Sequence, residues 1–324
     1  TGPTLFDLLA HRALDYFEND ERTISQPEDL FQLNTPDVFG TTDAFVQWKI
    51  SSSNPASLHH RALLLFQKLA ITHKKNKATA ALADVELRRI SFAYRYSTLD
   101  NKNDYYRKAL ADLRETYRFS PVSAQAVYLL ASYYAEQAAQ YDFKKHKELA
   151  VGNPRWYYQT AAQLCKQVIQ ENSNSEGAVN CSNLLSDIER KNFSVTLEQV
   201  NLPAQPFRSL VTYRNMKQIW FRIVAIRQQP EEHPEDDFWD METWSRLISL
   251  QPTMAFSKAL PLQTDHQEHA VELPMPALNT GTYLVIASAD ASFSTADNIL
   301  AAQYIHVSSL AWFNHRNHFF VVDR

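Results

Sequence analysis

Hydrophobic residues recur with a helical period through the first part of the chain. A first helix is predicted over Thr4–Asn19, and its apolar side would consist of Leu5, Leu8, Leu9, Ala13, Tyr16 and Phe17. The following segment, Ser25–Asn54, is rich in Pro, Asn, Asp and Thr and reads as irregular. Because it is long for a structureless loop, we expect it to pack against the helices.

Six further helices are predicted between Ala56 and about Lys191, paired as three consecutive hairpins. The third helix shows the pattern most regularly, with a stripe at four-residue steps formed by Tyr105, Ala109, Leu113 and Tyr117. Small alanines alternate with tyrosines and leucines, which suits close antiparallel helix packing. The pair within Tyr105–Tyr134 loosely matches a tetratricopeptide-type repeat, whereas the other pairs share only its spacing.

The period changes near Asn192 from about 3.6 residues to 2, which predicts β-strands. A β-hairpin is expected from two strands, Leu210–Tyr213 and Lys217–Ile226, joined by a turn at Asn215-Met216. The other predicted strands are Phe193–Leu197, Ala255–Leu262, Ala270–Leu273, Thr282–Ala289 and Leu300–Val307. So many short strands predict a β-sandwich of the immunoglobulin or fibronectin kind.

One short helix is predicted to interrupt these strands, over Trp239–Leu250, with Met241, Trp244 and Leu247 facing inward. The apolar run Phe319–Val322 is strand-like, but as a lone strand it would have no partner. We therefore expect it to open a further domain. The predicted fold class is multidomain α then β: a helical-hairpin domain over 1–191 with an irregular segment at 25–54, a β-sandwich over 192–312, and a linker with the next domain's first strand over 313–324.

Composition adds exclusions to this picture. The net charge is −4 and acidic and basic residues are mixed along the chain, which argues against nucleic-acid binding. No stretch approaches the roughly 18 apolar residues that span a bilayer. No signal peptide is visible, but the chain starts at Thr1 without Met, so we expect a processed or engineered start.

The glycines exclude several enzyme motifs. There are five, and no two lie closer than 25 positions. A phosphate-binding loop, a dinucleotide-binding turn and the nucleophile elbow of hydrolases all need closely spaced glycines. No Ser, His and Asp or Cys and His set stands in an activating context either. We therefore expect no catalytic residues, no cofactor and no enzyme activity.

The histidines offer weak metal candidates. The pair His266 and His269 lies near a predicted strand in poor metal geometry, and His59 and His60 diverge from adjacent helix positions. The pair formed by His315 and His318 falls in the predicted linker. We expect ordinary surface histidines and no metal site.

Three other groups leave alternatives open. The acidic run Glu231–Glu242 suits either calcium or solvent, but it lacks a twelve-residue loop with a central glycine. The cysteines Cys165 and Cys181 lie on consecutive helices and form either a facing pair or two buried free thiols. Tyrosines cluster over Tyr94–Tyr158, where they either bind a peptide or partner domain or fill space between hairpins.

The segment Phe193–Trp312 resembles a macroglobulin domain of the bacterial alpha-2-macroglobulin family. The resemblance rests on Val271–Pro274, Ala277-Leu278, Gly281–Ser288 and Ile305–Leu310. The terminal Phe319–Arg324 resembles the opening strand of the next such domain. The stretch Thr4–Leu14 is similar to the start of very large proteins of this type from Bacteroidetes, in which helices precede a series of β-domains.

The resemblance implies the N-terminal scaffold and interaction segment of an endopeptidase inhibitor that traps proteases. It also implies export to the periplasm or envelope, with a lipoprotein anchor before this segment as the membrane attachment. The expected partners are other domains of the same longer chain, proteases bound through regions outside this segment, and a peptide or protein in the helical array. Neither Cys165 nor Cys181 fits the family's C-x-E-Q thioester motif.

Two alternatives remain at this point. The chain could be a stand-alone envelope adaptor with helical repeats and an immunoglobulin-like domain. It could also be an enzyme with accessory domains, which a deep pocket with convergent carboxylates or histidines would support.

Overall fold

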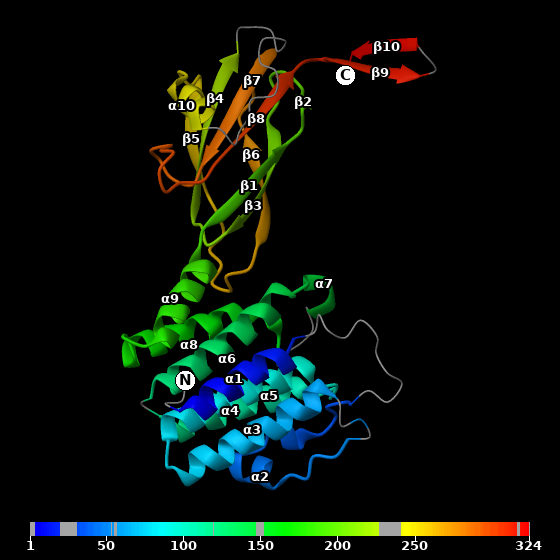
Figure 1. Ribbon diagram of the computed structural model, residues 1–324. Coiled ribbons are helices and arrows are strands. Elements are labelled where there is room, and N and C mark those ends of the chain that lie inside the picture. The colour runs from blue at the N-terminus through cyan, green and yellow to red at the C-terminus, as the bar shows by residue number, and fades with distance from the viewer. Residues whose placement is uncertain are drawn as a thin grey trace. The chain divides into compact units, whose positions relative to one another are not determined.

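The computed structural model describes residues 4–19, 31–52, 54, 57–118, 120–146, 152–226, 241–315 and 318–323. The chain divides into two compact units, Thr1–Asp187 and Ile188–Arg324. The first holds helices and the second is β-rich, with two larger sheets (Figure 1). The predicted order of α then β is therefore confirmed. Strand β1 begins at Asn192, where the hydrophobic period changes.

The helical unit contains all six predicted hairpin helices. Its elements are α1 (Leu5–Phe17), η2 (Pro36–Phe39), α2 (Thr42–Gln47), α3 (Leu58–Lys75), α4 (Thr79–Tyr96), α5 (Lys102–Thr116), α6 (Pro121–Ala139), α7 (Phe143–His146), η3 (Pro154–Trp156), α8 (Tyr157–Glu171) and α9 (Glu176–Glu189). The hairpins are α3–α4, α5–α6 and α8–α9. Ser120 caps α6 and Pro121 occupies its first turn, since a proline there loses no helical hydrogen bond.

The described part of the segment 25–54 packs on the helices, as expected. It buries Leu33, Val38, Phe39 and Phe45 in the same core as α3 and α4. The segment is not irregular throughout, because η2 and α2 form within it. Thr35 and Thr41 start these two elements by accepting hydrogen bonds from Asp37 N and Ala44 N.

The predicted inner face of α1 is wrong. The buried residues are Asp7, Ala10 and Leu14, whereas Leu5, Leu8, Leu9 and Tyr16 are exposed. Polar contacts decide which side of α1 is buried. Thr4 and Asp7 form a capping box at the start of the helix, and the Asp7 carboxylate contacts buried His73 of α3. This contact turns the leucines outward.

The β unit holds three sheets. Its strands are β1 (Asn192–Leu197), β2 (Val200–Asn201), β3 (Phe207–Arg214), β4 (Gln218–Ile226), β5 (Met254–Ala259), β6 (His269–Met275), β7 (Gly281–Ser288), β8 (Leu300–Val307), β9 (Leu310–His315) and β10 (His318–Asp323). One sheet has the order β1-β3-β6 and another the order β2-β8-β7-β4-β5. All pairs are antiparallel except β2 with β8.

The two larger sheets share one core. Its buried members from both sheets include Phe193, Val211, Tyr213, Ile219, Phe221, Ile223, Leu273, Val285 and Ile305. The five-stranded sheet is buried on its other face as well, where Leu284 and Ile286 meet Leu247 of α10 (Met241–Ser249) and Phe293. Burial on both faces explains why β7 reads as a continuous apolar run. Helix α10 is as predicted, except that Met241 is exposed.

The predicted hairpin around Asn215-Met216 is wrong. Strand β3 pairs with β1 and β6, while β4 pairs with β5 and β7, so the chain changes sheets between them. Asn215 adopts a left-handed φ of 57° at this corner. Its side-chain amide donates to the carbonyls of Ile188 and Arg190. The corner is therefore fixed by side-chain hydrogen bonds instead of by strand pairing.

The apolar run near the end of the chain has a partner. Strand β10 pairs antiparallel with β9, and His318 lies opposite His315. The prediction of a lone strand was wrong because β9, over Leu310–His315, was not foreseen. Among the described residues, no helix is both long enough and apolar enough to cross a membrane.

Candidate functional site

Five tyrosines from four helices form a continuous series of ring contacts, called here the tyrosine ladder: Tyr94 of α4, Tyr106 of α5, Tyr133 and Tyr134 of α6, and Tyr157 of α8. The first two rings stack with centroids 4.0 Å apart. The later steps are edge-to-face, at 6.1, 5.6 and 5.1 Å. Both geometries are favourable for aromatic pairs. The ladder therefore joins the three helical hairpins.

The tyrosines of the ladder differ in how far they are buried. Tyr106 and Tyr133 are only 5% and 6% exposed, so they fill space between hairpins. Tyr94, Tyr134 and Tyr157 are half-buried and leave part of each ring accessible. The packing alternative is therefore correct for Tyr106 and Tyr133, while the three half-buried rings keep a surface that a partner can contact.

Charged groups of both signs surround this surface. The Lys102 ammonium lies 5.3 Å from the centroid of the Tyr94 ring. Arg107 donates hydrogen bonds to Tyr134 and Asp104. Burial, assisted by the charge of Glu136, raises the pKa of Tyr94. The ladder thus presents hydroxyls and ring edges between charged groups, which suits contact with a polypeptide.

A small polar cavity of about 140 Å³ lies between α4, α5 and the η2–α2 segment. The Arg89 guanidinium is buried beside it and donates to the carbonyl oxygens of Val38 and Gly40. It also stacks over the Phe45 ring, 4.4 Å from its centroid. Arg89 therefore holds η2 against α4. A cavity of this size is below the roughly 300 Å³ at which small-molecule sites begin.

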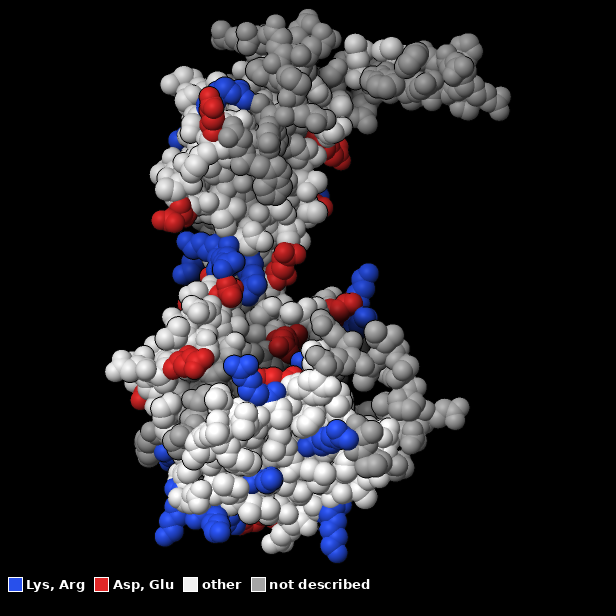
Figure 2. Space-filling model, in the orientation of Figure 1, with Lys and Arg blue, Asp and Glu red and all other residues white. Residues whose placement is uncertain are grey.

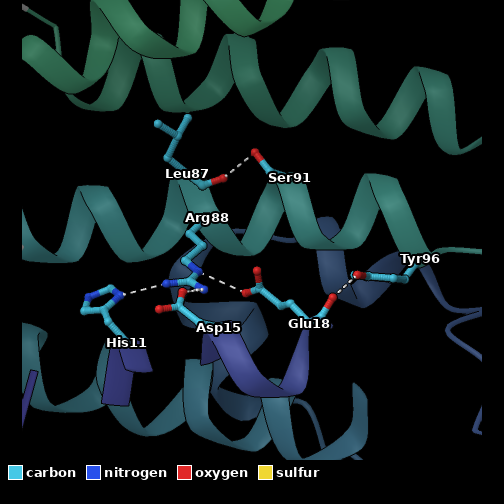
Figure 3. Close-up of polar contacts among 7 residues, drawn as sticks. All are labelled: His11, Asp15, Glu18, Leu87, Arg88, Ser91 and Tyr96. Atoms are coloured by element: carbon cyan, nitrogen blue, oxygen red, sulfur yellow. Dashed lines mark hydrogen bonds and ion pairs between the residues drawn. The ribbon is translucent and has the colours of Figure 1, made fainter. Parts of the chain in front are cut away.

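A second polar network joins α1 to α4 (Figure 3). Arg88 contacts two residues of α1 and the residue that caps its end: Asp15 Oδ1 at 2.7 Å, His11 Nδ1 at 3.2 Å and Glu18 Oε1 at 2.9 Å. Burial and the nearby Arg88 charge lower the pKa of His11, so its ring accepts from the guanidinium. The Tyr96 hydroxyl donates to Glu18 O at 2.5 Å. These contacts fix the rotation of α1.

Sequence reasoning missed both arginines. They are adjacent on a helix whose neighbouring positions Val85, Ile90 and Phe92 are core residues. Arg89 lies one turn after Glu86, and both are buried. A charged pair at this spacing inside an apolar helical stripe is the signal that could have identified Arg89, since charges are rarely buried without partners.

Four of the histidines considered in the sequence analysis make specific contacts. His60 is buried beside the Phe31 ring, and His59 packs on Tyr96 with centroids 4.1 Å apart. The His269 ring contacts buried Asp265 at 2.8 Å, and the His266 ring contacts Asn215 at 2.8 Å. The expectation of surface histidines was wrong for His60, because this residue lies on the buried side of α3 and packs against Phe31.

The other candidates are resolved in part. Cys165 and Cys181 are buried free thiols that also face each other, because a hydrogen bond links them. The two cysteines are therefore both a facing pair and buried free thiols. The acidic run lies outside the described residues except Glu242, which is exposed on α10. Within the described residues, no group of three His, Cys, Asp or Glu side chains could hold a metal ion. The side chains of His315 and His318 lie outside this description.

The chain was compared with models of known protein families and with curated proteins. Neither comparison gives a match.

Proposed function

We propose that this chain is a non-enzymatic scaffold and interaction segment of a bacterial alpha-2-macroglobulin-like protease inhibitor of the cell envelope. In this proposal the β unit is a macroglobulin-type sandwich of the immunoglobulin or fibronectin kind. The helical unit is a tetratricopeptide-like array. Proteases would be bound through regions outside these residues, and the membrane would be reached through a lipoprotein anchor that precedes them.

One observation carries the proposal: the segments that resemble macroglobulin domains coincide with strands of the β unit. The segment Val271–Pro274 lies within β6, and Gly281–Ser288 is the whole of β7. The segment Ile305–Leu310 spans the end of β8 and the first residue of β9. The strands β6 and β7 contribute to the core shared by the two sheets. The resemblance therefore follows the hydrophobic framework, as a relationship in fold would require.

The packing of the helical unit supports the proposal that it is a tetratricopeptide-like array. Small buried residues lie on its hairpin helices: Ala109, Ala126, Ala131, Ala161, Ala162 and Ala178. Small side chains let helices approach closely, and at Gly177 an added Cβ would lie 2.5 Å from the Ala124 carbonyl carbon. Such packing supports a stacked array of hairpins. The half-buried part of the tyrosine ladder is then its docking surface for a peptide or a neighbouring domain.

The mechanical role follows from these contacts. Inhibition in the resembling family is physical, since bait cleavage lets many β-domains rearrange around the protease. A segment that has to survive this rearrangement needs internal rigidity. The ladder supplies it across the hairpins, and the doubly buried five-stranded sheet supplies it in the β unit.

The decisive experiment uses the full-length product of the gene. It is incubated with an endoprotease, and remaining activity is measured on a large protein substrate and on a small peptide substrate. A trap is expected to suppress cleavage of the large substrate while sparing the small one, because the enclosed protease keeps a free active site. Equal activity on both substrates, with and without the protein, would contradict the proposal.

The half-exposed tyrosines favour one alternative, a stand-alone helical-repeat and immunoglobulin-like adaptor. The coding sequence separates the two. Further β-domains and a C-x-E-Q motif after Arg324 are expected for the inhibitor. A stop codon directly after Arg324 would favour the adaptor.

A further inference from the structure

Helix α1 carries an unusual outer face. Leu5, Leu8 and Leu9 are 70%, 57% and 59% exposed, and Tyr16 is 45% exposed. Arg12 is exposed between them along the same side of the helix. Large apolar side chains gathered on one helix face usually mark an interaction site, whereas scattered ones need no explanation. This face is the starting point of the inference.

The outer face of α1 is held in place. Asp7 on the opposite side of the helix contacts His73 of α3 at 3.2 Å, and both side chains are almost fully buried. Arg88 of α4 binds the flank of α1 through Asp15 and Glu18 (Figure 3). Because both contacts would break if α1 rotated, the leucines cannot turn into the core without the loss of buried polar interactions.

Helix α3, packed beside α1, extends this surface. Its exposed positions follow a helical stripe that alternates basic and apolar residues: Arg61, Leu64, Lys68, Ile71 and Lys75. Leu64 is 43% exposed and Ile71 is 49% exposed. The Lys68 ammonium lies 5.6 Å from the centroid of the Phe6 ring of α1, so the basic stripe borders the first helix.

Most of the charge around this surface is positive, and the exposed carboxylates beside it, Asp15 and Asp43, are paired with Arg88 and Lys74. Between Asp43 and Asp84 the chain holds six basic residues and no Asp or Glu, although its net charge is −4. All six are exposed: Lys49, Arg61, Lys68, Lys74, Lys75 and Lys77. In Figure 2 the lower end of the helical unit, over α2 and α3, is blue and white with little red. Charge is therefore segregated here, which the sequence analysis did not recognise.

We propose that the outer faces of α1 and α3 form a docking surface for an anionic lipid bilayer. Leucines on a helix that lies flat, bordered by lysines and arginines, are the pattern of an interfacial helix, whose apolar side enters the headgroup boundary. The basic side chains are attracted by the negative potential of anionic lipids. The centres of protein interfaces are enriched in aromatic side chains, whereas the apolar part of this surface is leucine and isoleucine apart from Tyr16.

The test measures sedimentation of the 324-residue chain with vesicles of phosphatidylcholine alone or mixed with phosphatidylglycerol. We expect binding only to the mixed vesicles, and weaker binding as salt rises. Lys68→Gln with Lys75→Gln should weaken it about 30-fold, since each basic residue contributes about 1 kcal/mol at an anionic surface. Leu8→Ser with Leu9→Ser should weaken it by about tenfold or more.

The matched controls lie away from this surface. Leu262→Ser removes an apolar side chain that is 63% exposed in the β unit, and Lys145→Gln removes an exposed charge on α7. Both should bind as the unmodified chain does. Urea unfolding of every variant separates lost binding from lost folding, since all changed positions are exposed.

Three results would overturn the proposal. They are equal sedimentation with both vesicle types, no sedimentation with either, and binding unaffected by the leucine changes. Tight binding to polyglutamate with the leucine variants unimpaired would assign the surface to an acidic protein. The same result with a nucleic acid would assign it to that polymer.

Discussion

The Asp7 carboxylate lies 3.2 Å from Nε2 of His73, and neither side chain reaches solvent appreciably. Burial alone would disfavour the carboxylate. The hydrogen bonds from Thr4 and the charge of His73 outweigh this and lower the pKa of Asp7 below its ordinary value of 3.8. A group whose pKa is lowered by folding stabilises the folded state at every pH above its ordinary pKa. That stability is lost as the pH falls through the folded-state value.

Asp7→Asn should therefore destabilise the helical unit by about 2 kcal/mol at neutral pH. The difference from the unmodified chain should begin to shrink below about pH 4, where Asp7 of the unfolded chain takes up a proton. It should be smallest below the lowered folded-state pKa, where Asp7 is neutral in both states. Urea unfolding followed by circular dichroism at several pH values measures it. Asp112→Asn is the control, since this exposed partner of Lys108 should change stability by less than about 0.5 kcal/mol. A pH-independent difference for Asp7→Asn would contradict the assignment.

Gly177→Ala tests how closely α9 approaches α6. An added Cβ would lie 2.5 Å from the Ala124 carbonyl carbon and 2.6 Å from Gln125 N, both in the backbone. Since backbone cannot move aside cheaply, we expect a loss of about 1–3 kcal/mol, although alanine is the better helix former. Ser182→Ala at an exposed position of α9 should be neutral or slightly stabilising. Equal unfolding midpoints for both variants would show that the helices can separate.

Cys165 and Cys181 should resist alkylation in the folded protein. Both are buried, and the hydrogen bond to Cys181 together with burial raises the pKa of Cys165. Mass spectrometry after brief treatment with iodoacetamide should show no label at either thiol at neutral pH, and two labels in urea. The variant Ser182→Cys supplies an exposed thiol on the same helix, which should react at once. Fast labelling of Cys165 without urea would contradict its burial.

Asn215 should be costly to replace. Asn215→Ala removes the hydrogen bonds to Ile188 O and Arg190 O and places alanine at a φ of 57°. We expect a loss of about 2–3 kcal/mol in urea unfolding of the β unit. Asn215→Gly relieves the backbone strain but not the lost hydrogen bonds, so it should recover about 1 kcal/mol. Asn192→Ala, an exposed position at the start of β1, is the control. If the alanine and glycine variants lose the same stability, the left-handed φ of residue 215 would not contribute to the effect of replacing Asn215.

Hydrophobic periodicity predicted the positions of the elements well. The six hairpin helices, most strands and the change of period near Asn192 all follow from it. It failed where polar side chains decide orientation. On α1 the leucines suggest one inner face, but the buried contact of Asp7 with His73 selects another. Such a contact spans 66 positions of sequence and leaves no periodic trace.

Hydrophobic periodicity also did not predict which strands pair with each other. Two apolar runs around Asn215 suit a hairpin locally, yet their partners lie elsewhere in the chain. In the candidate site, the concentration of tyrosines was visible from sequence. Which of them are buried depends on how three hairpins stack, so Tyr106 and Tyr134 could not be distinguished in advance.

The change of sheets at Asn215 bears on synthesis of the chain. Val211 of β3 lies opposite Val271, and Ile223 of β4 lies opposite Val285, so each strand waits about sixty residues for one of its neighbours. Contacts this distant in sequence slow folding. While a ribosome adds those residues, β3 has only β1 beside it and β4 gains only β5, so neither sheet is complete. The nascent β unit therefore keeps unpaired strand edges and apolar surface until β7 and β8 emerge, which is the condition in which a chain is most prone to aggregate.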